Sequence, residues 1–333
     1  MMTFKARRKG LAVGLALAMT ALVLSPVVGQ QQTPYSIQEY QVYKAAIDEP
    51  NLGKREDAII GFMKANPDSK LTEYGLGNYV KLLQAYQKQG NHRKVVSAGE
   101  KLLALNPNEP NALQMVTYAA FQSRQLQKAA QYGEKFYGKM PSAGLAYILA
   151  LSYGTKNQAK YISYGEKAVA ALKPAETYQI VAELTNIYVT KKQWQKASEY
   201  GRKTIRAFSQ LKKPQGTSQA EWDKYVKMQT AIAHGAVGRN AAESRNWGGA
   251  ISSYSRALRN TSERGLRGEA YFYIGMGRWQ QNRIDDAMTA FARGSVQRGA
   301  PHAKHCRKHL EQLYKSTHND SLAGIEEFVE RVT

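Results

Sequence analysis

The sequence contains a single cysteine, Cys306, among 333 residues. No disulfide can form within the chain, so core packing has to supply the stability of the fold. Proline is also scarce, at 10 residues, while alanine, leucine, glutamine and lysine dominate the middle of the chain. Many helix formers with few helix breakers predict an all-helical protein. Hydrophobic residues make up 43% of the chain, which excludes wholesale disorder.

The short motifs that carry common chemistry are also missing. The sequence has no glycine-rich phosphate loop, no Gly-x-Ser-x-Gly elbow, no His-Glu-x-x-His and no Cys-x-x-Cys. No pair of acidic residues is obviously placed for acid and base catalysis. These absences favour a binding protein over an enzyme. We therefore expect neither a cofactor nor a small-molecule substrate.

Residues 1–29 have the layout of a secretory signal peptide. Basic residues within positions 5–9 precede an uncharged apolar run from Leu11 to Leu24. The run is shorter than the roughly 20 apolar residues that a membrane-spanning helix needs. We expect cleavage near Gly29 and a protein exported to the periplasm or secreted, and retention of the segment as an anchor is the alternative.

The chain is strongly basic. Without the signal segment it carries 43 Lys plus Arg against 26 Asp plus Glu, a balance near +17. Such a charge attracts anionic lipid, cell-wall polymer, nucleic acid or acidic protein over long distances. Because export is expected, nucleic acid is the least favoured of these partners, and we expect none.

A short phrase recurs along the chain. It reads Ser-Ala-Gly-Glu-Lys at 97–101, Gln-Tyr-Gly-Glu-Lys at 131–135, Ser-Tyr-Gly-Glu-Lys at 163–167 and Glu-Tyr-Gly-Arg-Lys at 199–203. Successive glycines of the phrase lie 34, 32 and 36 residues apart, and Pro107 and Pro141 are also 34 apart. A period near 34 predicts a repeated unit of two helices.

With this period, the sequence resembles the tetratricopeptide repeat (TPR) family. The small residue of the family's second helix is matched by Ala129, Ala197, Ala250 and Ala287, and the aromatic four residues later by Tyr254 and Phe291. The resemblance implies an all-α, right-handed α-solenoid of about seven helical hairpins, in an exported protein of bacterial type. Glycine stands in the phrase where the family usually has a large residue, and we expect the preceding tyrosine to supply the missing volume.

The hairpins implied by the resemblance span most of residues 35–300. Their ranges are 35–69, 72–107, 108–141, 142–174, 175–213, 218–261 and 266–300. The chain then divides into a signal peptide (1–29), an N-terminal array (30–213), C-terminal hairpins (214–300) and C-terminal capping helices (301–333). The polar stretch 212–217 is the candidate hinge between the two sets of hairpins.

Two helices near the C-terminal end can be predicted individually. The first helix of the sixth hairpin extends from Ala220 to Arg245, and a capping helix from Ala303 to Lys315 closes the stack with an apolar stripe. A solenoid needs such a cap because its last hairpin otherwise exposes an apolar face. A second short helical pattern follows within 319–333.

The resemblance also implies a binding surface, because the first helices of TPR hairpins line a concave groove. Projected onto this chain, the groove residues are Lys81, Gln84, Lys88, Gln114, Tyr118, Gln122, Glu183, Asn186, Arg239, Tyr273, Met276 and Trp279. Amide, aromatic and basic side chains suit an extended, net acidic segment of a partner protein. We expect a protein–protein interaction scaffold, with Tyr118 and Trp279 as apolar anchors.

Two other readings stay open. The first is binding of an anionic envelope polymer or membrane surface through the densest basic stretch, which comprises Lys191, Lys192, Lys196, Arg202, Lys203, Arg206, Lys212 and Lys213. The second is a metal site at His302, His305, Cys306 and His309, of which His302, Cys306 and His309 fall on one helix face. Neighbouring lysines and arginines disfavour a further cation there, so we assign no metal ligand.

Overall fold

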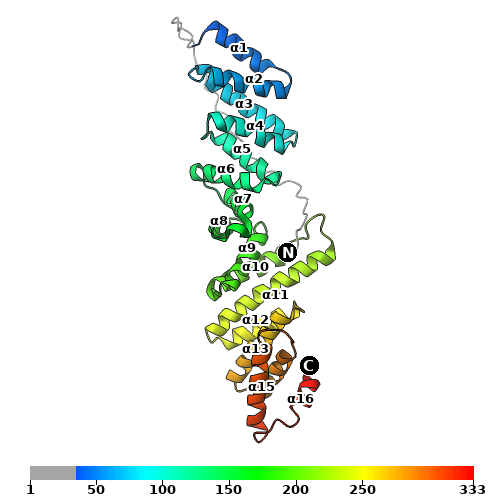
Figure 1. Ribbon diagram of the computed structural model, residues 1–333. Helices are drawn as coiled ribbons and strands as arrows, with labels where there is room; N and C mark the ends of the chain where they lie inside the picture. The colour runs from blue at the N-terminus through cyan, green and yellow to red at the C-terminus, as the bar shows by residue number, and fades with distance from the viewer. Residues whose placement is uncertain (1–34) are drawn as a thin grey trace. The chain divides into compact units, whose positions relative to one another are not determined.

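The computed structural model describes residues 35–333, so the predicted signal peptide lies outside the described residues. Within 35–333 the chain forms α-helices and one 3₁₀ turn, and no strand. The described chain divides into two compact units, residues 35–168 and 169–333, each considered by itself (Figure 1). No helix of this described part has the length and apolar character that crossing a bilayer requires.

The unit of residues 35–168 consists of consecutive helical hairpins. Its helices are α1 (Ile37–Asp48), α2 (Leu52–Ala65), α3 (Lys70–Lys88), α4 (His92–Leu105), α5 (Pro110–Gln122), α6 (Leu126–Lys139), α7 (Ala143–Tyr153) and α8 (Gln158–Ala171), the last of which runs past the boundary. A 3₁₀ turn, Gly154–Asn157, joins α7 directly to α8. Side chains of Ser36, Asn51, Ser69 and Ser142 cap helix N-termini, which explains where these helices begin.

The unit of residues 169–333 continues the same pattern. Its helices are α9 (Tyr178–Thr190), α10 (Trp194–Gln210), α11 (Gln219–Glu243), α12 (Trp247–Arg259), α13 (Arg264–Gln280), α14 (Ile284–Ser295), α15 (Ala303–Thr317) and α16 (Ile325–Val332). The predicted long helix from Ala220 and the predicted cap helix from Ala303 are therefore confirmed within two residues at each end. Leu310, Leu313 and Tyr314 are buried as the stripe of the cap.

One tight turn recurs inside the hairpins. The residue with positive φ in it is Gly90, Arg124, Lys192, Arg245 or Asn282. In each case the next backbone N–H donates to the carbonyl five residues earlier, as Gln125 does to Ala120 and Gln193 does to Tyr188. This is the hydrogen bond of the Schellman helix end, which satisfies a carbonyl that the helix leaves without a partner.

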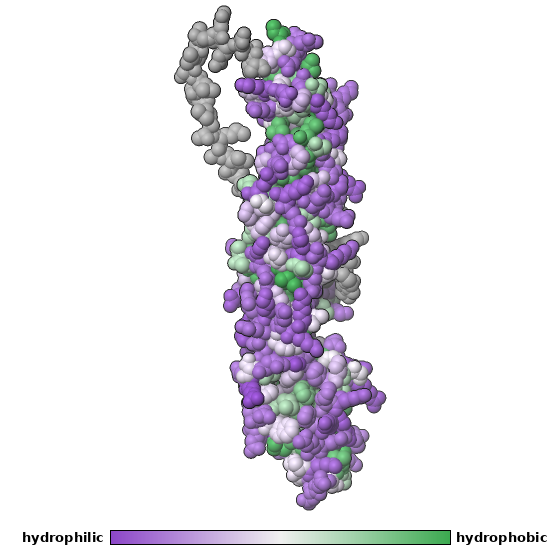
Figure 2. Space-filling view, turned by 60° about the vertical axis from the view of Figure 1, so that its left-hand side comes forward, coloured by the Kyte–Doolittle hydropathy of each residue, from purple (hydrophilic) through white to green (hydrophobic). Residues whose placement is uncertain are grey.

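Each unit has two helix layers with the core between them. First helices of successive hairpins contact one another, α1 with α3, α3 with α5 and α5 with α7 in one unit, and α9 with α11, α11 with α13 and α13 with α15 in the other. The predicted small residues Ala129, Ala197, Ala250 and Ala287 are fully buried. The face drawn in Figure 2 is mainly hydrophilic, with hydrophobic residues in separate small areas. The all-α solenoid of about seven hairpins with a C-terminal cap is confirmed.

The packing at the phrase glycines differs from the prediction. A Cβ atom on Gly99 would lie 2.2 Å from Val116, one on Gly133 would lie 2.9 Å from Leu149, and one on Gly201 would lie 2.9 Å from the carbonyl oxygen of Ala233. The first helix of the next hairpin therefore fills the space beside each glycine. The expectation that the preceding tyrosine supplies this volume was wrong for Gly133 and Gly201, because a neighbouring helix approaches too closely to leave room, and Gly99 follows an alanine.

Candidate functional site

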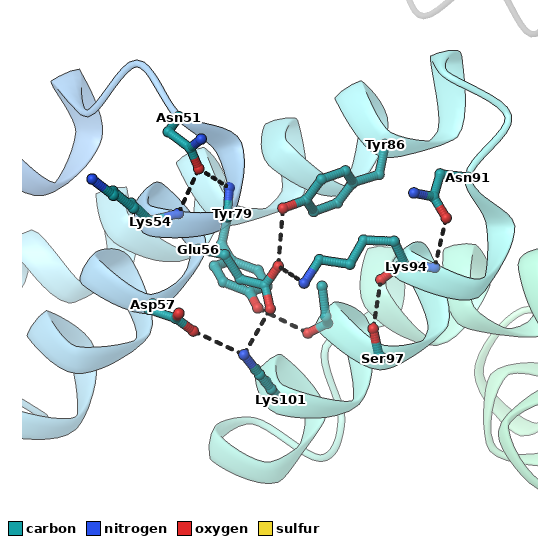
Figure 3. A network of polar contacts seen from close by, with 12 residues as sticks. Asn51, Lys54, Glu56, Asp57, Tyr79, Tyr86, Asn91, Lys94, Ser97 and Lys101 are labelled. Carbon is teal, nitrogen blue, oxygen red and sulfur yellow. Dashed lines mark hydrogen bonds and ion pairs between the residues drawn. The ribbon is translucent and has the colours of Figure 1, made fainter.

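A buried carboxylate organises the second-helix layer of residues 35–168. The Glu56 side chain is 1% exposed and lies 3.0 Å from the ammonium of Lys94 and 2.8 Å from that of Lys101 (Figure 3). The hydroxyl of Tyr86 donates to the same carboxylate at 3.0 Å. Burial, together with this carboxylate, raises the pKa of Tyr86 to about 12. Three donors from α3 and α4 thus hold one acidic group of α2.

The repeated phrase extends this arrangement to the following hairpins. Glu100 accepts from Lys128 at 2.7 Å and from the Tyr132 hydroxyl at 3.1 Å. Glu134 accepts from Lys160 and from the Tyr164 hydroxyl, the latter at 3.1 Å. The glutamate of one phrase therefore binds the tyrosine of the next phrase and the lysine four residues before that tyrosine. We call the contacts centred on Glu56, Glu100 and Glu134 the glutamate ladder. It explains the phrase as a structural link between hairpins.

The predicted groove residues of this unit lie on the other layer. Lys81, Gln84 and Lys88 are on α3, while Gln114, Tyr118 and Gln122 are on α5, and α3 packs directly against α5. All are exposed except Tyr118, which is half-buried. Burial raises the pKa of the Tyr118 hydroxyl. The structure thus brings these six residues onto two adjacent helices of one layer.

Aromatic residues at the start of this layer did not appear in the prediction. Tyr40 on α1 is 42% exposed and Tyr74 on α3 is 63% exposed. The amide of Asn78 joins the two helices by donating to the Tyr43 hydroxyl at 2.8 Å. Tyr74 stands seven residues before Lys81, two helical turns away on the same face, and this spacing was the signal that could have included it.

In residues 169–333 the predicted groove residues are more deeply engaged. The Arg239 guanidinium lies 4.6 Å from the ring centre of Trp194 and 4.7 Å from that of Tyr273, and it pairs with Glu243 at 2.8 Å. Of the predicted residues in this unit, Arg239 and Tyr273 are thus in direct contact. Glu183 and Asn186 lie half-buried on α9.

The other predicted residues of α13 belong to the packing of the cap. Met276 and Trp279 are partly buried against the cluster that includes Leu310 and Leu313. The ring of Trp279 lies 5.6 Å from that of His309. The anchoring role of Trp279 stays a prediction, and much of this side chain already contacts the chain's own cap.

The histidines of α15 gather around an aromatic ring. The rings of His302, His305 and His309 lie 5.2, 6.1 and 5.8 Å from Phe272. Cys306 is instead fully buried, with its sulfur 3.9 Å from the carbonyl of Gly268, and burial raises the pKa of its thiol to about 12. Across residues 35–333, no three His, Cys, Asp or Glu side chains are placed to hold a metal ion.

Several members of the predicted basic stretch have intramolecular contacts. The Lys196 ammonium lies 5.0 Å above the ring of Tyr188, and Lys203 pairs with Glu199 at 2.7 Å. Lys213 donates to the carbonyl of Thr217 at 2.7 Å, across the predicted hinge. These contacts reduce the number of cations that this stretch presents to a partner.

Comparison with known proteins gives structural matches. No protein-family model matches the chain, and no curated protein matches its sequence. The structure is similar to that of a tetratricopeptide repeat protein from Parabacteroides merdae, at 12% identity and a TM-score of 0.35, over 83% of this chain and 97% of that one. It is also similar to YrrB, described as a TPR protein with an unusual peptide-binding site, at 12% identity and a TM-score of 0.24, over 76% of this chain and 99% of that one. The repeated hairpins, Schellman turns and buried alanines described above show that this chain has the fold of a tetratricopeptide repeat array.

Proposed function

We propose that this protein is a non-catalytic scaffold that holds an extended, net acidic segment of another protein. The proposed surface is the first-helix layer of residues 35–168, around α3 and α5. A single observation carries the proposal, namely that α3 and α5 together present lysines and glutamines with no partner in residues 35–333 beside a half-buried tyrosine.

On the second-helix layer, the glutamate ladder holds Lys94, Lys101, Lys128 and Lys160 in ion pairs. On the first-helix layer, Lys81 and Lys88 form no ion pair within residues 35–333, and the amides of Gln84, Gln114 and Gln122 form no hydrogen bond there. Glutamine offers both a donor and an acceptor to the backbone of an extended segment. The unpaired lysines attract a segment that carries negative charge.

Tyr118 supplies an apolar contact in the middle of this surface. Its side chain packs against the core on one side and is half-buried. Its orientation is thus restricted before binding, so it loses little conformational entropy in the complex. Rigid aromatic side chains of this kind are common among the residues that dominate interface energies.

A random peptide display library, selected on the wild-type chain, tests the proposal. We expect selected peptides rich in Asp and Glu, and a loss of affinity of about tenfold or more for Tyr118→Ala, the range of a strong interface residue. The double substitution Lys81→Glu and Lys88→Glu should mainly slow association. Its effect should fade as salt screens charges beyond about 8 Å.

The matched control is the double substitution Lys64→Glu and Lys135→Glu, which changes the same charge at exposed positions of second helices. We expect it to leave peptide affinity nearly unchanged. Equal losses in the two double variants, together with full binding by Tyr118→Ala, would reject the first-helix layer as the site.

We also propose that the protein acts outside the cytoplasm, after removal of residues 1–29. The proposal is supported by the order of basic, apolar and small residues in that segment. An intact-mass measurement on protein purified from its native source should show a chain that starts near Gln30. A full-length mass would contradict cleavage.

A further inference from the structure

One edge of the unit of residues 169–333 is unusually rich in cations. Because consecutive helices alternate in direction, the connections α12–α13 and α14–α15 lie at one edge, and the tight turns α11–α12 and α13–α14 lie at the opposite edge. A Cβ on Gly235 of α11 would lie 3.0 Å from Leu266, and one on Gly268 would lie 2.9 Å from Ala300. The start of α13 therefore packs between α11 and the α14–α15 connection.

We call this surface the arginine edge. Its members are Lys227 and His234 of α11, Arg256 and Arg259 of α12, Arg264 of α13, and Arg298 of the α14–α15 connection. Lys227 stands seven residues before His234, two helical turns away on the same face of α11. The other five lie where α11, α12, α13 and the α14–α15 connection meet.

The cations of the arginine edge are not neutralised by the chain itself. Lys227, Arg256, Arg259, Arg264 and Arg298 are exposed and form no ion pair within the part of the chain that the structure describes. The one acidic residue of the α12–α13 connection, Glu263, is used as a helix cap and accepts from the backbone of Gly265 and Leu266. Its carboxylate forms no ion pair with these arginines.

The pKa of the buried His234 reflects both burial and the positive charge at this edge. The ring is 8% exposed, and its pKa is lowered to about 4, first by burial and then by the charges of Arg256 and Arg259. The positively charged form of the His234 ring is thus disfavoured by burial and by the charges of two guanidinium groups. An anion bound at the same place would be stabilised by the same field.

Two exposed apolar side chains stand close to these cations in the sequence. Met228, next to Lys227, is 48% exposed, and Val296, two residues before Arg298, is 41% exposed. A soluble polyanion would make no use of them, whereas a lipid surface binds cations through phosphate groups and apolar side chains at the acyl boundary. Guanidinium groups also suit phosphate, which they bind with two parallel hydrogen bonds.

We propose that the arginine edge docks onto an anionic phospholipid surface. Phosphate groups of the headgroups contact the arginines and Lys227, while Met228 and Val296 enter the headgroup boundary. This surface uses none of the residues proposed to bind the partner segment on the first-helix layer of residues 35–168.

Sedimentation with vesicles tests the proposal on the full chain. We expect pelleting with vesicles of equimolar phosphatidylglycerol and phosphatidylcholine, and little with phosphatidylcholine alone. The triple substitution Arg256→Gln, Arg259→Gln and Arg264→Gln should weaken binding about a hundredfold, since each cation near an anionic surface contributes about fivefold. Circular dichroism should show unchanged helicity, because all three side chains are exposed.

The matched control is Lys191→Gln, Lys192→Gln and Arg245→Gln, which removes three exposed cations from the turns at the opposite edge of the same unit. It should weaken vesicle binding by roughly tenfold or less, which is less than the arginine-edge variant, because it lowers the net charge without removing the cations of the arginine edge. Equal losses in both variants, or equal binding to neutral vesicles, would overturn the proposal. Binding to soluble heparin that depends on the three arginines, without vesicle binding, would reject the lipid surface and indicate a soluble polyanion.

Discussion

The two units share one kind of contact between successive hairpins, and the first unit adds another. In residues 35–168, the glutamate ladder supplies charged hydrogen bonds from one hairpin to the next. In residues 169–333, very close approach at glycines joins one hairpin to the next and to the cap, since a Cβ on Gly201 would lie 2.9 Å from the carbonyl oxygen of Ala233 and one on Gly294 would lie 2.4 Å from the sulfur of Cys306. Close approach at Gly99 and Gly133 also joins hairpins of the first unit, so the glutamate ladder adds charge to a kind of contact that both units share.

The two units also use different cations. Residues 35–168 contain 14 lysines and 3 arginines, whereas residues 169–333 contain 12 lysines and 14 arginines. In the first unit, four lysines are held by the ladder, while the arginine edge of the second unit has no comparable acidic partners. The comparison teaches that one repeat architecture accepts two kinds of contact, and that these should respond differently to charge, volume and pH.

The largest effect is expected from breaking the first rung of the ladder. Glu56→Gln leaves two lysines without their buried counter-charge and should destabilise α2 and α4 by about 3 kcal/mol, the low end for breaking a buried ion pair, because both lysines still reach water. Hydrogen exchange should show faster opening of α2–α4 and unchanged exchange of α13 and α14. The exposed Glu73→Gln on α3 is the control, with a change near zero.

The close approach of α10 to α11 in the second unit can be tested at Gly201. A methyl group there meets the backbone oxygen of Ala233, which cannot rotate away, so Gly201→Ala should destabilise the contact of α10 with α11 by about 2 kcal/mol. Exchange protection of these two helices measures the effect. Gly61→Ala on α2, which has no atom within 4 Å of the new methyl group, should instead stabilise its helix by about 0.5–1 kcal/mol. A stabilised Gly201→Ala chain would show that close approach at this glycine does not hold α10 against α11.

A smaller effect should follow from removing one hydroxyl of the ladder. Tyr132→Phe keeps the ring and removes the donor to Glu100, which should cost about 1 kcal/mol. Lys128 continues to neutralise Glu100, so the helices should remain packed. Local exchange in α4 and α6 is the measurement, and a loss as large as that of Glu56→Gln would mean that the rungs are not independent.

The smallest expected effect is a difference between the two units in how their stability depends on pH. Burial, followed by the charge of Arg239 and by His305, lowers the pKa of His302 below its ordinary 6.5, and burial also lowers the pKa of His309. The unfolded cap then binds protons that the packed cap does not, so stability of α15 is full above about pH 6.5 and decreases as pH falls below it. Exchange in α15 should therefore increase first.

The ladder should respond in a lower pH range. Burial alone would raise the pKa of Glu134, but hydrogen bonds from Lys160, Tyr153 and Tyr164 lower it below its ordinary 4.5. Its contribution is present above about pH 4.5 and is lost as pH falls further. Loss of protection in α6 and α8 before α15 during acidification would contradict this order.

Local features of the sequence were sufficient to predict much of the architecture. The spacing of the phrase glycines and of Pro107 and Pro141 predicted the hairpins, because each hairpin is formed by residues close together in the chain. The limits of α11 and α15 followed from local breakers and apolar periodicity for the same reason. Of the candidate site, the sequence placed all twelve residues on first helices, but it did not show that Trp279 packs against the cap or that Arg239 is held between two aromatic rings.

By itself, the sequence determined that this is an all-α array of helical hairpins with a C-terminal cap, since helix periodicity, turn residues and small core positions act over one or two turns of chain. Tertiary structure alone decided which partner each of these residues meets. The helix after the phrase fills the space beside Gly99, Gly133 and Gly201, Cys306 enters the core instead of joining the histidines, and the glutamates bind the next hairpin's lysines. Such contacts join residues about 16 to 38 positions apart, and their geometry depends on how helices approach one another, which no local pattern encodes.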